Sequence, residues 1–331
     1  MAMKTPFSKD VLRIDCAREA ERITAALRDV VLVNFKKRGA VVALSGGIDS
    51  SVVGALCVAA FGKERVLGLL MPEKDSSKKT LGLGRLIVEH LGIKAETEDI
   101  TQILDSVGCY RRRDEAIRSV VPEYGPGYKS KIVLPGFTDE QQYRLFSVVV
   151  ESPEGVQKKV RLTRDAYLGI VAATNFKQRT RKMLEYYYAD KHNYAVAGTP
   201  NLLEYDQGFF VKNGDGAADV KPIGHLYKTQ VYQMAEYLGL PDTIRSQQPT
   251  TDTYSLPQSQ EEFYFSVPYD KMDLCLFGKN HGVTPSAVAA TAGLTEEQVE
   301  NIYKDIEAKR SVSRYLHSPP VLIDDVREKA K

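Results

Sequence analysis

In the first part of the chain, two patterns of hydrophobic and polar positions alternate, one typical of strands and one typical of helices. Short apolar runs at 40–44 and 65–71 are typical of strands buried on both faces of a parallel sheet, and residues 93–97 are predicted as a third, shorter strand. Between them, apolar side chains recur every three to four positions, as they do on one face of a helix. This order of elements predicts a parallel sheet with helices on both faces. The first helices are predicted over residues 10–35, 49–61 and 80–91.

A stretch at about 105–160 interrupts this rhythm. It holds the charged run Arg111–Glu115 with several prolines and glycines, so we interpret it as an insertion whose charges face solvent. Residues 245–268 are polar and rich in Pro and Gln, which predicts a mobile loop. We expect one α/β domain over 1–331, with a Rossmann-like parallel sheet of about five strands, helices on both faces, and helical N- and C-terminal extensions. The remaining elements are predicted as helices at 163–190, 226–238, 269–277, 285–291 and 295–310 and a strand at 194–198.

The composition narrows the possible classes of protein. Lys and Arg number 45 against 43 Asp and Glu, and a net charge of +2 does not indicate a nucleic-acid binder. The chain has no run of about 18 apolar residues and no apolar signal core, so we expect no membrane contact and a cytoplasmic location. The four cysteines form no C-x-x-C pair, which argues against structural zinc. Cys57 and Cys275 lie in apolar runs and are predicted core residues.

A glycine-rich turn joins the first predicted strand to the next helix. Adjacent glycines let the backbone approach an anion, and the helix N-terminus offers free N–H groups and a partial positive charge. The turn is neither a Walker A loop nor a G-x-G-x-x-G dinucleotide fingerprint. Because Asp49 would repel phosphate, we interpret it as a ligand of a Mg²⁺ bound with the phosphates; the alternative is a plain helix cap. The turn comprises Ser45, Gly46, Gly47, Ile48, Asp49, Ser50 and Ser51.

This string resembles the phosphate loop of the N-type ATP pyrophosphatases. Those enzymes cleave ATP between the α- and β-phosphates to adenylate a carboxylate, amide or nucleobase oxygen, and the resemblance implies an adenine-nucleotide α-hydrolase fold. Further ordered blocks resemble the NAD synthetase patterns N-x-K-x-R-x-R, G-T-x-N-x-x-E, G-D-G-x-x-D and L-x-K-x-x-V. They lie at 175–181, 198–204, 208–219 and 226–231.

Two residues in these blocks also carry a physical argument. Glu204 follows a buried strand, so it should lie at the carboxyl edge of the sheet, where ligands bind in such folds, and could share Mg²⁺ with Asp49. Lys228 stands in the first turn of a helix, which disfavours a cation unless an anion lies nearby. The alternatives are a solvated loop acid and a surface lysine.

The resemblance implies roles for the other site residues. It makes Lys228 and Asp49 catalytic, Asp49 and Glu204 the Mg²⁺ ligands, and ATP the co-substrate. Besides the turn, the ATP-binding residues would be Arg181, Thr199, Lys228 and Thr250. The residues binding deamido-NAD would be Asn175, Lys177, Arg179, Lys212, Asp215 and Asp219. Because the cations of 177–181 do not share one helix face, a solvated basic surface is their alternative.

Some loop positions depart from the family pattern. The usual lysine before Pro249-Thr250 is absent, and the aromatic run 263–265 replaces a small or aliphatic pair. Near the C-terminus, a family His-Lys pair that contacts the neighbouring subunit's substrate is absent. The sequence leaves open how these positions affect substrate choice; they are Gln247, Gln248, Phe263, Tyr264, Phe265, Arg314 and Tyr315.

The blocks together predict ATP-dependent amidation of deamido-NAD to NAD with ammonia, through an adenylated carboxylate and with release of AMP and pyrophosphate. The resemblance implies a homodimer, and ammonia as direct donor unless a separate glutaminase docks. One alternative is another ATP pyrophosphatase, an amidotransferase or a sulfurtransferase, for which Cys109 is the candidate thiol. A non-catalytic nucleotide-binding protein is the other.

Overall fold

A parallel sheet forms the centre of the computed structural model, which describes residues 7–133, 146–247, 254–258, 264–265 and 267–323. Its strand order is β3-β2-β1-β7. In register, Val41 of β1 lies between Leu67 of β2 and Val196 of β7. All of β2 is buried, as its continuous apolar run predicted. The strands are β1 (Ala40–Ala43), β2 (Val66–Leu70), β3 (Lys94–Thr97) and β7 (Ala195–Ala197).

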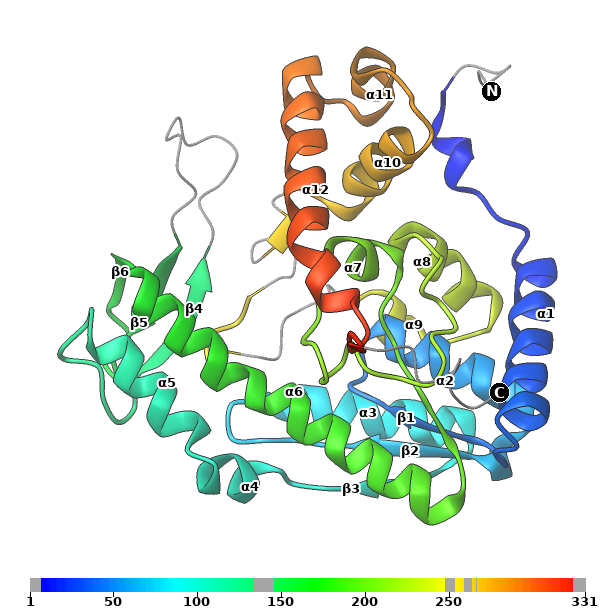
Figure 1. Ribbon diagram of the computed structural model, residues 1–331, viewed down its shortest axis with the longest axis horizontal. Coiled ribbons are helices and arrows are strands. Elements are labelled where there is room, and N and C mark those ends of the chain that lie inside the picture. The colour runs from blue at the N-terminus through cyan, green and yellow to red at the C-terminus, as the bar shows by residue number, and fades with distance from the viewer. Residues whose placement is uncertain (1–6, 134–145, 248–253, 259–263, 266, 324–331) are drawn as a thin grey trace.

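The predicted fold class is confirmed, with four strands in this sheet within the described ranges. Beyond β7, Ala197 forms an isolated parallel bridge to Val220, so a further segment meets the edge without becoming a strand. Helices cover both faces (Figure 1). One face packs on α1 (Cys16–Leu27), α2 (Ile48–Phe61), α3 (Lys78–Leu91) and α8 (Lys228–Tyr237). The other packs on α4 (Thr101–Ser106) and the long α6 (Arg164–His192).

The N-terminal segment differs from the single predicted helix over 10–35. A short 3₁₀ turn (Lys9–Leu12) comes first, and α1 begins only after Asp15, whose side chain accepts a hydrogen bond from the N–H of Arg18. A wider turn of π type (Arg28–Asn34) follows α1. The cap at Asp15 explains the break, because a capping side chain starts a new helix where the periodic pattern alone shows no boundary.

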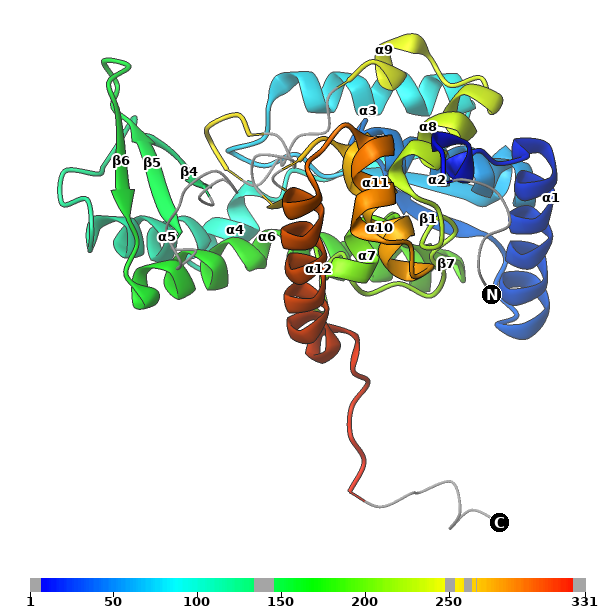
Figure 2. The same cartoon turned by 90° about the horizontal axis from the view of Figure 1, so that it is seen from above.

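The predicted insertion forms a projecting unit that we call the arm, residues 109–161. It consists of α5 (Cys109–Arg118) and an antiparallel sheet in the order β4-β5-β6. Figure 2 shows the arm at one end of α6, away from the central sheet. Its core joins Ile132, Val148 and Val150 to Ile170 of α6. The strands are β4 (Lys129–Val133), β5 (Ser147–Glu151) and β6 (Gln157–Arg161).

The C-terminal extension is helical, as predicted, and its helices build a second core with α7 (Leu202–Gln207). The last of them continues past the predicted end at 310 to His317. A short α9 (Asp242–Arg245) follows α8. Within the described ranges, no helix has the length and apolar character needed to span a membrane. The three C-terminal helices are α10 (Tyr269–Asn280), α11 (Pro285–Ala292) and α12 (Glu296–His317).

Candidate active site

The glycine-rich turn lies between β1 and α2, and its shape depends on its glycines. Gly46 has a φ of +76°, and a Cβ there would lie 2.4 Å from the Cβ of Leu83, so only glycine fits. Gly47 is the N-cap of α2, and no side chain caps the helix there. Ser50 and Ser51 donate hydrogen bonds to its carbonyl at 3.0 and 2.8 Å. The first N–H groups of α2 therefore stay available for an anion.

Asp49, in the first turn of α2, is held from two sides. Its Oδ2 forms an ion pair with the ammonium of Lys228, and its Oδ1 accepts a hydrogen bond from Nδ2 of Asn201 at 3.0 Å. The side chain of Lys228 is 0% exposed. Asp273 fixes the start of α8 by accepting from the N–H of Thr229 at 2.7 Å. The fold therefore places Lys228 beside Asp49 at the start of α2; its role in binding or catalysis stays a prediction.

Glu204 supplies a second carboxylate at this edge of the sheet. It forms a capping box with Asn201 at the start of α7, so its Oε2 accepts from the N–H of Asn201 at 3.2 Å. Burial, reinforced by the negative charge of Asp49, raises the pKa of Glu204 to about 8. The cost of keeping both carboxylates charged here indicates a place for a cation besides Lys228.

Mg²⁺ fits this donor set, because it commonly binds one or two carboxylates and takes its other oxygens from phosphates and water. Asp49 and Glu204 are the carboxylates that would hold it. Within the residues that the structure describes, no cluster of three or more His, Cys, Asp and Glu could hold a metal by itself. The ion would therefore depend on the oxygens of a bound nucleotide.

A cavity of about 730 Å³ extends from the glycine-rich turn to the arm, within the size range of ligand pockets. The turn, the ends of β1, β2 and β7, and one face of α6 line it. Thr199, Glu204 and Asp215 lie on its wall. The predicted residues Asn175 and Arg181 lie there too, on the α6 face that consists of Val171, Thr174, Asn175, Gln178, Arg181, Lys182 and Glu185.

Two charged residues on this wall had not been predicted. Lys182 and Glu185 form a buried ion pair with a distance of 2.6 Å between Nζ and Oε2. Burial raises the pKa of Glu185 and that of Asp215, which accepts a hydrogen bond from the N–H of Val211 at 2.8 Å. Both residues could have been predicted from helical periodicity, because Lys182 and Glu185 lie on the same face of the helix as Asn175, at steps of three or four residues.

Other predicted residues lie outside the cavity wall. Ser51 is buried behind the turn, and Arg179 donates to the carbonyl of Lys212 at 3.3 Å. Lys212 itself donates to the carbonyls of Tyr315 and Ser318 near the end of α12. Asp219 accepts from the N–H of Val196 at 2.8 Å, at the outer edge of the sheet. Their assignments to ligands stay predictions, and Thr250 lies outside the described residues.

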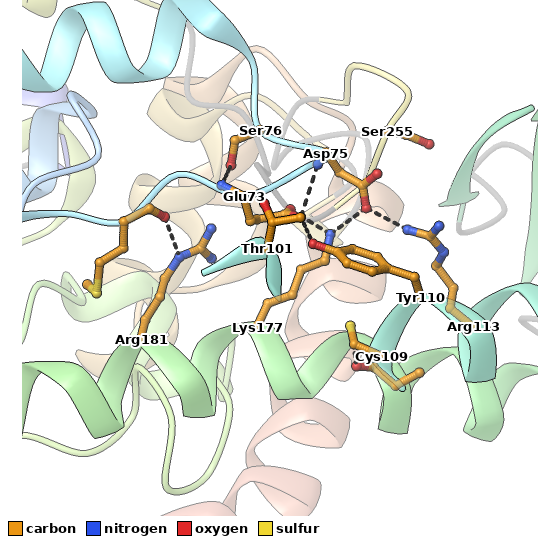
Figure 3. Close-up of polar contacts among 12 residues, drawn as sticks. Glu73, Asp75, Ser76, Thr101, Cys109, Tyr110, Arg113, Lys177, Arg181 and Ser255 are labelled. Carbon is orange, nitrogen blue, oxygen red and sulfur yellow. Dashed lines mark hydrogen bonds and ion pairs between the residues drawn. The ribbon is translucent and has the colours of Figure 1, made fainter. Parts of the chain in front are cut away.

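Lys177 is the centre of a buried ion network (Figure 3). Its ammonium lies 2.7 Å from both Glu73 and Asp75, in the loop that follows β2. Arg113 of α5 pairs with Asp75 at 2.5 Å, and the hydroxyl of Tyr110 donates to Glu73 at 2.8 Å. The prediction that Arg111–Glu115 is a solvated cluster is therefore wrong for Arg113, whose side chain is 6% exposed. The error arose because the partner acids lie far away in the sequence.

Of the loop positions that depart from the family pattern, some line the cavity and others are buried in the core. Gln247 and Tyr264 line the cavity, and Tyr264 donates from its hydroxyl to the carbonyl of Gln207 at 2.7 Å. Phe265 is fully buried against Phe209, with ring centres 5.5 Å apart. Tyr315, on α12, lies under the ammonium of Lys212 at 4.2 Å. Gln248 and Phe263 lie outside the described residues.

The cysteines are structural in this arrangement. Cys57 and Cys275 are fully buried, as predicted. Cys109 is buried as well, and its Sγ donates to the carbonyl of Ala173 at 3.2 Å. Burial raises the pKa of the Cys109 thiol to about 11, so little thiolate forms at neutral pH. None of the three lies on the cavity wall.

Comparison with known proteins gives close relatives over almost the full chain. The NH(3)-dependent NAD(+) synthetase of Rhizobium meliloti (strain 1021) is 58% identical over 322 residues, covering 97% of this chain and 96% of that protein. The protein of the same name from Mesorhizobium japonicum is 58% identical, covering 96% and 100%. The one from Thermotoga maritima is 33% identical, covering 88% and 95%.

Solved structures share the fold at lower sequence identity. The NMN synthetase from Francisella tularensis superimposes with a TM-score of 0.64 at 22% identity, covering 94% of this chain and 100% of that one. The NH3-dependent NAD synthetase from Campylobacter jejuni gives a TM-score of 0.62 at 22% identity, with the same coverage. The model of the NAD synthase family matches residues 19–120 and 148–313. With the turn, the paired carboxylates and Lys228 at one edge of the sheet, this chain belongs to the NAD synthase family.

Proposed function

We propose that the chain is an ammonia-dependent NAD synthetase, which uses ATP to convert the nicotinate carboxylate of deamido-NAD into the amide of NAD. The observation that carries the proposal is the buried Lys228–Asp49 pair beside the uncapped N-terminus of α2, with Glu204 opposite. Relatives that are 58% identical over nearly the whole chain carry the same activity in their names.

The reaction needs ATP because a carboxylate is a poor electrophile. A carboxylate oxygen of deamido-NAD attacks the α-phosphorus of ATP, and the bond to the bridging oxygen breaks, so that pyrophosphate leaves with the electron pair. The nitrogen of ammonia then attacks the acyl carbon of the adenylate. AMP leaves, and ammonia gives up a proton to solvent. Neither step requires a covalent bond to the protein.

The residues of this edge stabilise the departing charge. The N–H groups of α2 and the turn cradle the pyrophosphate, and Lys228 adds a positive charge in a buried position, where charge–charge interactions are strong. Although burial lowers the pKa of Lys228, the negative charges of Asp49 and Glu204 raise it above its usual value. Lys228 therefore stays cationic throughout.

Mg²⁺, held by Asp49 and Glu204, would neutralise phosphate charge when bound. Asn201 orients both ligands, because its side chain donates to Asp49 and also forms the capping box with Glu204. A sulfurtransferase is disfavoured, since the thiol of Cys109 is buried with a raised pKa and lies outside the cavity wall. The proposed enzyme works as a homodimer and takes ammonia directly; a glutaminase would act only as a separate partner.

The test follows NAD and pyrophosphate together in purified protein supplied with Mg-ATP, deamido-NAD and either ammonium or glutamine. We expect NAD and pyrophosphate in equal amounts with ammonium and neither with glutamine alone. Nicotinic acid mononucleotide, supplied in place of deamido-NAD, tests whether the enzyme amidates a mononucleotide instead. Preference for the mononucleotide, or no pyrophosphate under any of these conditions, would refute the proposal.

A further inference from the structure

The arm touches the cavity at two places, and both are well defined. The first is the ion network, in which Arg113 of α5 pairs with Asp75 and Lys177 joins Asp75 to Glu73. All four side chains are at most 7% exposed. The loop of Glu73 and Asp75 continues into Ser76 and Ser77, which line the cavity. One side of the cavity is therefore anchored to the base of the arm.

The second place is the outer edge of β4, where residues 254–258 lie alongside the strand. The N–H of Ser130 donates to Oγ of Ser255 at 2.9 Å, and its carbonyl accepts from the N–H of Leu256 at 3.2 Å. Gln258, which is 2% exposed, donates to the carbonyl of Ile132 at 2.6 Å. Tyr254 packs into the core of the arm. The segment is thus bound to β4 much as an added strand would be.

These residues also form part of the cavity wall. Ser255 and Gln258 lie on the wall together with the rings of Phe146 and Tyr167. Those two rings stack with centres 4.0 Å apart and planes inclined by 16°. A wall of stacked aromatic rings next to hydrogen-bonding groups suits a planar heterocycle with polar edges.

The arm strand belongs to the part of the chain that the family model omits. The model matches residues 19–120 and 148–313, and β4 lies between these ranges. The wall at 254–258 therefore depends on a strand that the general family pattern does not contain.

We propose that the arm is a positioning element for nucleotide binding, in which β4 holds residues 254–258 as the wall that receives the nucleoside ring of a substrate. This inference rests on the proposed function for the identity of the nucleotides. Adenosine occurs in both ATP and deamido-NAD, and the experiment separates the two sources. Because the arm residues do not touch the reacting phosphates, they should alter substrate affinity and leave the chemical step unchanged.

The test removes the N–H of Ser130 in β4. Both backbone groups of Ser130 bond to residues 254–258, so Ser130→Pro deletes the donor to Ser255 while sparing the pairing with β5 at this edge strand. Ser130→Pro also removes the side-chain hydroxyl, which accepts a hydrogen bond from the hydroxyl of Tyr124 at 3.2 Å. Ser130→Ala is the matched control, because it loses the same hydroxyl but keeps the N–H. Loss of one hydrogen bond predicts a rise of about two- to tenfold in KM for ATP or for deamido-NAD, with kcat within about twofold of wild type.

A second pair of variants keeps the test informative if the proline variant fails to fold. Ser255→Ala removes the acceptor, and Ser255→Thr keeps a hydroxyl and should restore the wild-type KM. Ser119→Ala, an exposed hydroxyl on the same arm, should change nothing. Equilibrium titration with ATP and with deamido-NAD measures the affinity of each variant for each nucleotide without turnover.

The outcomes separate this inference from the proposed function. Weakened binding of either nucleotide in the Ser130→Pro or Ser255→Ala variant supports the inference, whether or not the wild type makes NAD. Unchanged affinity and KM for both nucleotides in folded variants would overturn it. Failure of the wild type to form NAD would overturn the proposed function alone.

Discussion

At the scale of single residues, the site buries charged side chains next to one another, and burying any one of them alone would destabilise the fold. Lys228 is fully buried, and its ion pair with Asp49 offsets the desolvation cost of the buried ammonium. Burial, reinforced by the negative charge of Asp49, raises the pKa of Glu204 to about 8, although the nearby ammonium of Lys228 acts in the opposite direction. Two neighbouring buried carboxylates favour binding of a divalent ion.

The raised pKa of Glu204 predicts a pH-dependent stability. The folded protein holds a proton on Glu204 that the unfolded chain releases above about pH 4.5, so this stabilisation is complete below that pH and is lost as pH rises towards about 8. The free energy of unfolding of metal-free protein should fall by up to about 1.4 kcal/mol per pH unit in that window from this group. Urea unfolding at several pH values measures it.

Glu204→Gln provides the comparison, because glutamine keeps the capping box and carries no titrating proton. The variant should lose this part of the pH dependence and should gain less stability from added Mg²⁺ than wild type does. Equal slopes for the two proteins between pH 5 and pH 8 would contradict the assignment of the shift to Glu204.

At the scale of elements, α6 carries different functions on its different faces. One face lines the cavity with Asn175, Arg181 and Lys182, and another carries Lys177 into the ion network. Because the network also includes Arg113 of α5, it joins two helices to the loop after β2. The helix therefore serves as a common support for the loop after β2 and for α5 of the arm (Figure 3).

Lys177→Met should destabilise the protein strongly. The change removes the shared partner of Glu73 and Asp75 and leaves buried carboxylates short of a cation, which costs about 3–5 kcal/mol. Chemical unfolding measures the loss. Lys191→Met, an exposed position on the same helix, is the control and should cost less than about 1 kcal/mol. Wild-type stability with a raised KM for deamido-NAD would show instead that this ammonium serves substrate.

At the scale of the whole molecule, one group of exposed apolar side chains lies near the C-terminus of the described chain. Val312 and Tyr315 on α12 are 72% and 71% exposed, and Ile323 is 97% exposed. Such large exposed apolar side chains mark an interaction surface when they occur together.

The proposed homodimer predicts a particle of twice the chain mass of 36.9 kDa in light scattering. Ile323→Ser should shift the equilibrium towards single chains, because it removes exposed apolar area from the interface. Val156→Ser, at the 67% exposed Val156 in the arm, should leave the mass unchanged. A single-chain mass at all protein concentrations would rule out the dimer.

The sequence alone determined the features that local pattern encodes. Continuous apolar runs identify the buried strands, and the glycine-rich turn between strand and helix identifies the anion cradle, because both depend on neighbours in the chain. The position of Glu204 at this edge also followed, since the carboxyl ends of parallel strands meet at one edge of the sheet. The place of Lys228 in the first turn of a helix indicated an anion nearby.

Only the tertiary structure decided which side chains meet. It pairs Lys228 with Asp49, buries Arg113 and Lys177 against the loop after β2, and turns Lys182 instead of Lys177 towards the cavity. It also lays residues 254–258 on β4. These contacts join segments that are distant in the chain, and which faces they present to each other depends on how the helices and sheets pack, which local periodicity does not encode.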